Sequence, residues 1–112
     1  MTDFCRGDIC LVNFNPAKGG EMGKLRPAII MSTQEEIVLL ETVIVIPLST
    51  VVTLDAMPYR FFVSKRENLQ KQSDACIYEI RALSKQRIKE KIAALTQAEL
   101  QSVQNALCEL LG

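Results

Sequence analysis

Residues 42–50 read TVIVIPLST, and the four apolar, β-branched residues 43–46 stand near the start of this stretch. A short apolar run of this kind, bounded by turn residues, is typical of a central strand buried on both faces. Two hydroxyl residues, Ser49 and Thr50, follow directly where the run ends. The sequence therefore predicts a fold built around a strand over residues 42–48.

Four further stretches rich in Val, Ile, Phe, Tyr or Leu are bounded by turn residues and are predicted strands. They cover residues 7–14, 27–32, 58–63 and 75–80. Between the first two, residues 15–24 hold three glycines and a proline, which predicts a long loop. Loops of that length in a compact domain are often functional.

The C-terminal segment predicts a helix. Thr96 and Glu99 stand three residues apart, which is the spacing of a capping box. The apolar residues Leu100, Val103, Leu107 and Leu110 then recur every three or four positions and form one stripe. A shorter helical turn is predicted over residues 65–70.

Several short strands and one terminal helix indicate a mainly β protein, a small and strongly bent barrel with a helix packed against it. The 112 residues suffice for one core, so a single domain over residues 1–112 is expected. No apolar run is long enough to cross a membrane, and the first residues do not resemble a signal peptide. A cytoplasmic protein without membrane contact is the prediction.

The chain contains no histidine, which excludes histidine-based catalysis and histidine-ligated metals. The carboxylates are scattered, so neither a two-metal nuclease nor any other metal site is predicted, and no cofactor is expected. The four cysteines lack a C-x-x-C spacing and are predicted to be reduced and mostly buried: Cys5, Cys10, Cys76 and Cys108.

Charge is balanced overall but uneven along the chain. Residues 60–91 carry nine basic and four acidic residues, whereas residues 1–59 carry four basic and seven acidic ones. Such a basic segment permits binding to a polyanion. A solvated helix or loop face explains the same charges equally well.

Arg26 follows the glycine-containing loop and precedes Pro27, which restricts Arg26 to an extended backbone. A guanidinium held at such a junction is suited to clamp a phosphate with two parallel hydrogen bonds. The alternative, favoured by the residues alone, is a structural arginine that pairs with Asp8 or Glu21. The loop itself does not match the phosphate-binding G-x-x-x-x-G-K-[ST] motif.

Ser49 and Thr50 are the second candidate. Two hydroxyls at a strand end can donate hydrogen bonds to a phosphate. Simple hydrogen bonding within a turn accounts for them just as well.

Taken together, these segments resemble one family. The fragments RGDICLVNFNP (6–16), KGGEMG (18–23), RPAII (26–30), VIPLS (45–49), DACI (74–77), EIRAL (79–83) and KIAALT (91–96) follow one another as in MazF/PemK toxins. The resemblance spans nearly the whole chain in order. It implies an SH3-like barrel of the CcdB/MazF/PemK type with a C-terminal helix.

The resemblance also implies the toxin component of a type II toxin–antitoxin system. Such a toxin is a homodimeric, metal-independent endoribonuclease that cuts single-stranded RNA, here expected to be mRNA, at specific sequences and so stops growth. A MazE/PemI-like antitoxin would bind over the RNA groove, with larger toxin–antitoxin complexes and contact with operator DNA only through the antitoxin.

Family roles transfer to matching positions of this sequence. The implied catalytic residues are Arg26, Ser49 and Glu21, and the expected RNA contacts are Gly20, Lys24, Thr50 and Arg81. Thr50 would take the hydroxyl role if the register differed by one residue. The acidic and basic pair that some members place before the I-R dipeptide is replaced here by Tyr78 and Cys76, so that mechanism does not carry over.

A metal-free cut requires the RNA 2′-hydroxyl to attack the adjacent phosphorus, which gives a 2′,3′-cyclic phosphate. Arg26 would neutralise the charge of the phosphorane, and Glu21 is the candidate general base. The alternative function is a non-enzymatic, CcdB-like gyrase poison, a class that lacks the R-P dipeptide and loop glutamate found here. A plain SH3-like interaction module is a third possibility.

Overall fold

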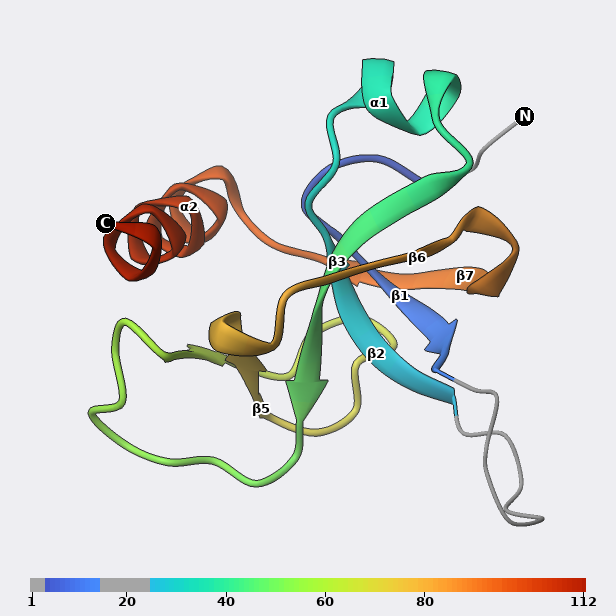
Figure 1. Cartoon of the computed structure of the whole chain (residues 1–112). Helices are drawn as coiled ribbons and strands as arrows, with labels where there is room; N and C mark the ends of the chain where they lie inside the picture. The colour runs from blue at the N-terminus through green and yellow to red at the C-terminus, as the bar shows by residue number, and fades with distance from the viewer. Residues whose placement is uncertain (1–3, 15–24) are drawn as a thin grey trace, which may run out of the picture.

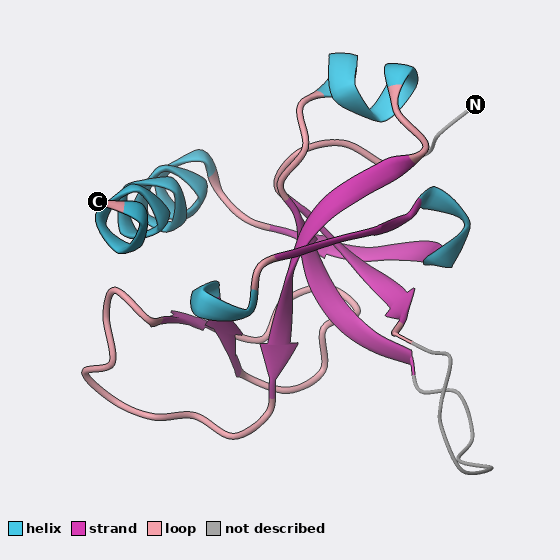
Figure 2. Ribbon diagram, viewed as in Figure 1, coloured by secondary structure: helices cyan, strands magenta, loops and turns pink. Residues whose placement is uncertain are grey.

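The computed structural model describes residues 4–14 and 25–112 of the chain (Figure 1). These residues form seven strands, two α-helices and two 3-10 turns (Figure 2). In chain order they are β1 (Asp8–Asn13), β2 (Leu25–Ile30), α1 (Gln34–Leu39), β3 (Thr42–Ser49), β4 (Arg60–Val63), β5 (Ser73–Cys76), η1 (Ile77–Glu79), β6 (Arg81–Ser84), η2 (Lys85–Arg87), β7 (Ile88–Ala94) and α2 (Gln97–Leu111).

Strand β3 is the centre of the sheet. It pairs antiparallel with β2, with β5 and, through its first half, with β6. The strand order is β4-β5-β3-β2-β1-β7, with β6 beside β3. The strands cross at steep angles, as in a bent barrel that does not close (Figure 1). The predicted mainly β fold with a C-terminal helix is confirmed.

All five predicted strands are present, with bounds that differ from the predicted ones by up to four residues. The largest difference lies in residues 75–80, where only the first two are strand and Ile77–Glu79 form a 3-10 turn. Strands β6 and β7 and helix α1 were not predicted. β7 carries Lys89, Glu90 and Lys91 on its exposed half, which hides the strand pattern in the sequence.

Helix α1 forms because Thr33 and Glu36 make a complete capping box at its start. Of its six residues only Ile37 is buried. The side chain of Lys85 donates from Nζ to the carbonyl oxygen of Ile37 at 2.7 Å, which satisfies a carbonyl near the helix end. A helix this short has too little apolar periodicity to be seen in the sequence.

The helical turn predicted over residues 65–70 is wrong. Arg66 and Leu69 pair as an isolated antiparallel bridge, and Glu67 between them has a φ of 45°. A left-handed residue ends any helical path. The buried Leu69 side chain and the bridge favour a tight turn instead.

The sheet separates two apolar clusters, because alternate residues of a strand face opposite sides. Ile9 and Ile29 belong to the first cluster, which α2 covers with Leu100, Val103 and Ala106. Cys10, Val12, Ala28 and Ile30 belong to the second, which α1 covers with Ile37; Val43, Val45 and Leu83 complete it, and Phe14 packs at its edge. The Thr96–Glu99 capping box starts α2 as predicted.

All four cysteines are free, as predicted, but only two are buried. Cys10 and Cys76 lie in the core, whereas Cys5 and Cys108 are exposed. Neither of the two described helices is long and apolar enough to span a membrane.

Gly7 generates a prediction about stability. Its φ is +92°, and a Cβ built there would lie 3.3 Å from Cδ2 of Leu100. Gly7→Ala should therefore lower the free energy of unfolding by about 1–2 kcal/mol, measured by urea denaturation. Gly112→Ala is the matched control, since Gly112 also has a positive φ but no atom lies within 4 Å of its Cβ position. Equal unfolding midpoints for the two variants would contradict this account.

Candidate active site

Three strands have a terminus at the same end of the sheet, which we call the rim; the start of β2 lies beside the end of β1, and the end of β3 stands apart from both (Figure 1). These termini are the last residue of β1, Asn13, the first of β2, Leu25, and the last of β3, Ser49. The rim is set by the antiparallel pairing of β2 with both neighbours, in which Asn13 lies opposite Leu25. Four of the predicted functional residues lie at or beside it.

Arg26 lies at the rim on the face of the second cluster. It is opposite Val12 in the β1–β2 ladder, and it shares its face with Ala28 and Ile30. The side chain is half-buried, and Nη2 donates to the carbonyl oxygen of Leu48 at 3.2 Å. This hydrogen bond holds the guanidinium against the end of β3.

Ser49 follows Leu48 and lies on the same face as Arg26. The β2–β3 ladder ends at the pair of Ala28 and Pro47, so Arg26 and Ser49 each lie two residues beyond that last pair. The Ser49 Oγ accepts a hydrogen bond from the backbone N–H of Val51 at 3.1 Å. Its own proton remains available to donate, which is what contact with a phosphate oxygen requires.

Thr50 is exposed and lines a cavity on the other side of the rim. Ser49 is the last residue of β3, whereas Thr50 lies beyond the strand and faces this cavity.

Arg81 joins Arg26 on the ring of Phe14. The Cζ of Arg26 lies 5.8 Å and the Cζ of Arg81 lies 5.3 Å from the ring centroid. Both distances are within the range of a cation–π contact. Arg81 reaches this place because it is opposite Val45 in the β3–β6 ladder and so faces the second cluster. Nothing in the neighbouring sequence marks Phe14 for this role.

The two guanidiniums lack a countercharge within the part of the chain that the structure describes. Its three ion pairs are Arg60–Asp74, Arg66–Glu99 and Lys91–Asp8, and none includes Arg26 or Arg81. Asp8 also accepts from the backbone N–H of Cys5 at 2.8 Å. The structural alternative in which Arg26 pairs with Asp8 is therefore wrong. Two like charges near one ring, without a carboxylate partner, favour the binding of an anion nearby.

Three predicted residues, Gly20, Glu21 and Lys24, lie outside the described residues. Their roles stay predictions.

A buried carboxylate fixes the loop that follows Ser49. Asp74 is 1% exposed, and its Oδ2 accepts from the backbone N–H of Thr53 at 2.7 Å and from Nη1 of Arg60 at 3.4 Å. The same Arg60 nitrogen donates to the carbonyl oxygen of Val51 at 2.9 Å. Since Ser49 lies opposite Asp74 in the β3–β5 ladder, this network orients the strand end.

Most of the basic side chains between residues 60 and 91 make contacts within the fold, so they are not free to bind a ligand. Six of the nine side chains contact a carboxylate or a backbone carbonyl: Arg60, Arg66, Lys85, Arg87, Lys89 and Lys91. Among the described residues, Lys65, Lys71 and Arg81 have no such partner. The basic segment therefore leaves few cations for a polyanion, and Arg81 is the one beside Arg26.

Cys76 and Tyr78 occupy the positions at which the resemblance would place an acidic and a basic residue. Cys76 is buried, and this burial raises the pKa of its thiol, so the group stays neutral near pH 7. Tyr78 is exposed. Within residues 4–14 and 25–112, no cluster of three His, Cys, Asp or Glu residues is placed to hold a metal ion.

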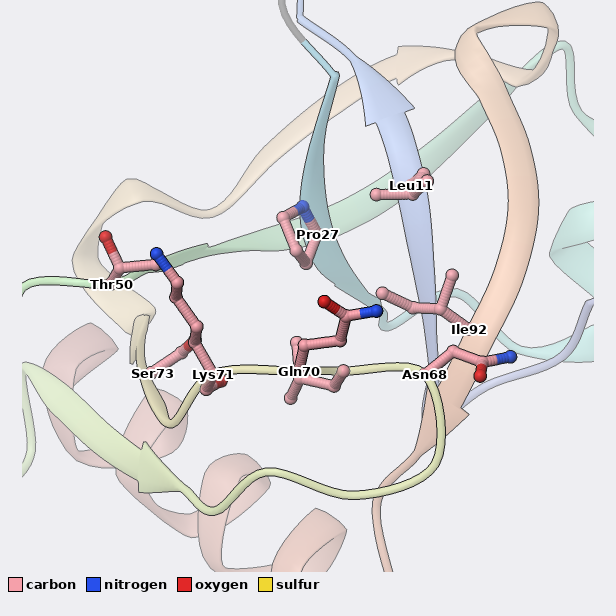
Figure 3. Close-up of a pocket in the computed structure, with 9 residues that line it drawn as sticks. Leu11, Pro27, Thr50, Asn68, Gln70, Lys71, Ser73 and Ile92 are labelled. Carbon is pink, nitrogen blue, oxygen red and sulfur yellow. The ribbon is translucent and has the colours of Figure 1, made fainter.

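A cavity of about 260 Å³ opens on the opposite side of the rim (Figure 3). Its apolar lining consists of Leu11, Pro27, Leu69 and Ile92, and its polar lining of Thr50, Asn68, Gln70, Lys71 and Ser73. Pro27 and Thr50 directly follow Arg26 and Ser49 in the chain.

An ion pair with α2 fixes the turn that forms one wall of this cavity. The Arg66 guanidinium pairs with the Glu99 carboxylate, with Nη2 to Oε2 at 2.8 Å, and also donates from Nη1 to the carbonyl oxygen of Ala94 at 3.3 Å. The hydrogen bond from Arg66 lowers the pKa of Glu99 below its ordinary value.

The model of the family described as PemK-like, MazF-like toxin of type II toxin–antitoxin system matches residues 5–111. An endoribonuclease MazF from Staphylococcus epidermidis is 32% identical over 108 residues, which cover 96% of this chain and 90% of that protein.

Two solved structures share the fold. A MazE–MazF structure from Deinococcus radiodurans has a TM-score of 0.82 at 20% identity and covers 100% of this chain and 98% of its own. The Mycobacterium tuberculosis toxin MazF-mt6 has a TM-score of 0.77 at 16% identity, with 93% of this chain and 95% of its own covered.

The depressed pKa of Glu99 predicts a pH-dependent contribution to stability. Because the pKa is lower in the folded state, the contribution is present above the pKa of the unfolded chain and is lost as the pH falls through the folded-state value. Glu99→Gln keeps the capping box but removes the charge, and should cost about 1 kcal/mol at pH 7. Urea denaturation at pH 7 and pH 3 measures this difference.

The difference between Glu99→Gln and the unaltered protein should shrink at pH 3. Glu109→Gln, at an exposed position of the same helix, is the control and should change stability by less than about 0.5 kcal/mol. A cost for Glu99→Gln that is the same at both pH values would show that the charge contributes nothing.

Proposed function

Because the chain belongs to the family of PemK-like, MazF-like toxins of type II toxin–antitoxin systems, we propose that it cuts single-stranded RNA without a metal ion. The observation that carries this proposal is the pair of guanidiniums of Arg26 and Arg81 on Phe14, with Arg26 hydrogen-bonded to the carbonyl oxygen of Leu48, the residue before Ser49. These groups match what a phosphodiester needs, namely positive charge, planar donors and a neutral donor.

The proposed reaction is an internal transesterification. The 2′-oxygen of the ribose forms a bond to the adjacent phosphorus, and the bond from phosphorus to the 5′-oxygen breaks. A proton leaves the 2′-hydroxyl and another reaches the 5′-oxygen, so the products are a 2′,3′-cyclic phosphate and a 5′-hydroxyl. The protein must align the attack and stabilise the negative charge of the phosphorane.

Arg26 performs the charge stabilisation. Its hydrogen bond to Leu48 and its contact with Phe14 fix the guanidinium before substrate arrives, so little reorganisation is needed during the reaction. Arginine does not lose its proton in proteins, so Arg26 is not the general base. Glu21 is the residue that we propose for that role.

Ser49 and Arg81 position the same phosphate or its neighbour. Ser49 donates to a non-bridging oxygen while its Oγ stays fixed by Val51. Arg81 is exposed and supplies the second positive charge. Gly20, Lys24 and Thr50 are proposed as further RNA contacts, and mRNA as the cellular substrate in the cytoplasm.

Protein partners are part of the proposal. Solved structures of MazE–MazF from Deinococcus radiodurans share this fold, which supports a cognate MazE/PemI-like antitoxin for this chain. A homodimer is proposed as well. On α1, Val38 is 72% and Leu39 is 80% exposed, and a second copy would remove this apolar surface from water.

Substitution of Arg26 tests the function. Arg26→Ala should lower the single-turnover rate of RNA cleavage in EDTA by about 100- to 1,000-fold, because one preorganised donor group to the phosphorane is lost. Arg26→Lys should recover little of this, since an ammonium cannot make two parallel hydrogen bonds. Ser49→Ala should have a smaller effect in the same direction.

The matched control is Lys65→Ala, which removes an exposed cation away from the rim. Its cleavage rate should stay within about twofold of the unaltered rate. Wild-type rates for Arg26→Ala would refute the assignment. If the protein arrested growth by poisoning DNA gyrase while cellular RNA stayed intact, the CcdB-like alternative would be established instead.

A further inference from the structure

We propose that the cavity beside the rim binds one nucleobase of the RNA, with the Gln70 amide contacting the edge of the base and Lys71 pairing with its phosphate. This inference rests on the proposed RNA cleavage and assigns part of its sequence specificity. The cavity lies between β1, β2, β7 and the segment before β5, away from the face that carries Arg26.

The size and lining of the cavity suit a base. Its volume of about 260 Å³ is just below the range of roughly 300–1,000 Å³ for drug-sized ligands, which leaves room for one planar ring system. Leu11, Pro27 and Ile92 form an apolar surface against which the face of a base can pack (Figure 3). Unstacked bases of single-stranded RNA need such a surface.

Two polar side chains stand over this surface. In Figure 3 the Gln70 amide rises toward Pro27, and the Lys71 chain extends toward Thr50. Both residues are exposed, and in the described part of the chain neither side chain takes part in a hydrogen bond or ion pair. An amide offers a donor and an acceptor side by side, which matches the polar edge of a base, and the ammonium suits a phosphate.

The wall that carries these side chains is fixed. Leu69 is 4% exposed and pairs with Arg66, and the backbone N–H of Asn68 donates to the carbonyl oxygen of Ile92 at 3.0 Å. The Ser73 Oγ donates to the carbonyl oxygen of Lys71 at 3.1 Å. A preformed wall costs little ordering entropy on binding, which favours selectivity for one base.

The location places the base close to the proposed cut. Two residues of the cavity, Pro27 and Thr50, are the chain neighbours of Arg26 and Ser49. An RNA strand that passes over the rim can hold its scissile phosphate on one face and turn an adjacent base into the cavity on the other. The unpaired Lys71 favours this anionic ligand over an apolar side chain of a protein partner.

Cleavage of a randomised RNA pool tests the site. Gln70→Ala should lose the base preference at one position near the cut and slow cleavage of the best sequence by about tenfold, with preferences elsewhere unchanged. Lys71→Gln should keep the preference but lower the slope of log affinity against log salt by about 0.7, the value for one phosphate contact on a single strand. Gln72→Ala, an exposed neighbour outside the cavity, is the control. A Gln70→Ala profile identical to that of Gln72→Ala would overturn the proposal.

A binding measurement separates this site from the proposed function. Amide NMR spectra of the isotope-labelled protein are recorded in the presence of each of the four nucleoside 3′-monophosphates. We expect saturable shifts of the Gln70 side-chain amide and none of the Gln72 amide. If these shifts occur but the protein does not cut RNA, the proposed nuclease function is refuted and the base-binding site is retained. No shift with any nucleotide, or shifts with N-acetyl-leucine amide alone, would overturn the base site while leaving cleavage intact.

Discussion

The antiparallel register around β3 is the constraint on which the site depends. β3 pairs with β2 through Ala28 and Pro47 and with β6 through Val45 and Arg81. This pairing turns Arg26 and Arg81 to one face, where both reach the ring of Phe14. A shift of one residue in either ladder would move one guanidinium to the opposite face of the sheet and separate it from the ring of Phe14.

The same alternation lets one rim serve two faces. Arg26 and Ser49 lie on the side of the second cluster, whereas Pro27 and Thr50 line the cavity on the other. The supporting contacts are separate too, since Asp74 and Arg60 hold the loop after β3, and Arg66 and Glu99 hold the turn before β5. Phosphate chemistry and base recognition can therefore be changed independently in this fold.

The sequence predicted the elements whose pattern is local. The apolar run in β3, the capping box of α2 and the Arg26–Pro27 junction each have a signal within a few residues. It missed α1, which has only six residues, and β7, whose exposed half is charged. It could not show that six of nine basic side chains are used within the fold, or that Phe14 gathers two arginines, because those contacts join residues far apart in the chain. The roles of Gly20, Glu21 and Lys24 stay predictions from family resemblance.

The most direct test of the central claim is the dependence of cleavage on the ribose 2′-hydroxyl. A defined RNA is compared in EDTA with the same strand carrying a single 2′-deoxy nucleotide 5′ to the cut. If Arg26 stabilises a phosphorane formed by the RNA's own oxygen, the unmodified strand yields a 2′,3′-cyclic phosphate and a 5′-hydroxyl, and the modified strand stays intact. Cleavage of the 2′-deoxy strand at the same bond would show that another nucleophile attacks, and the account would fail.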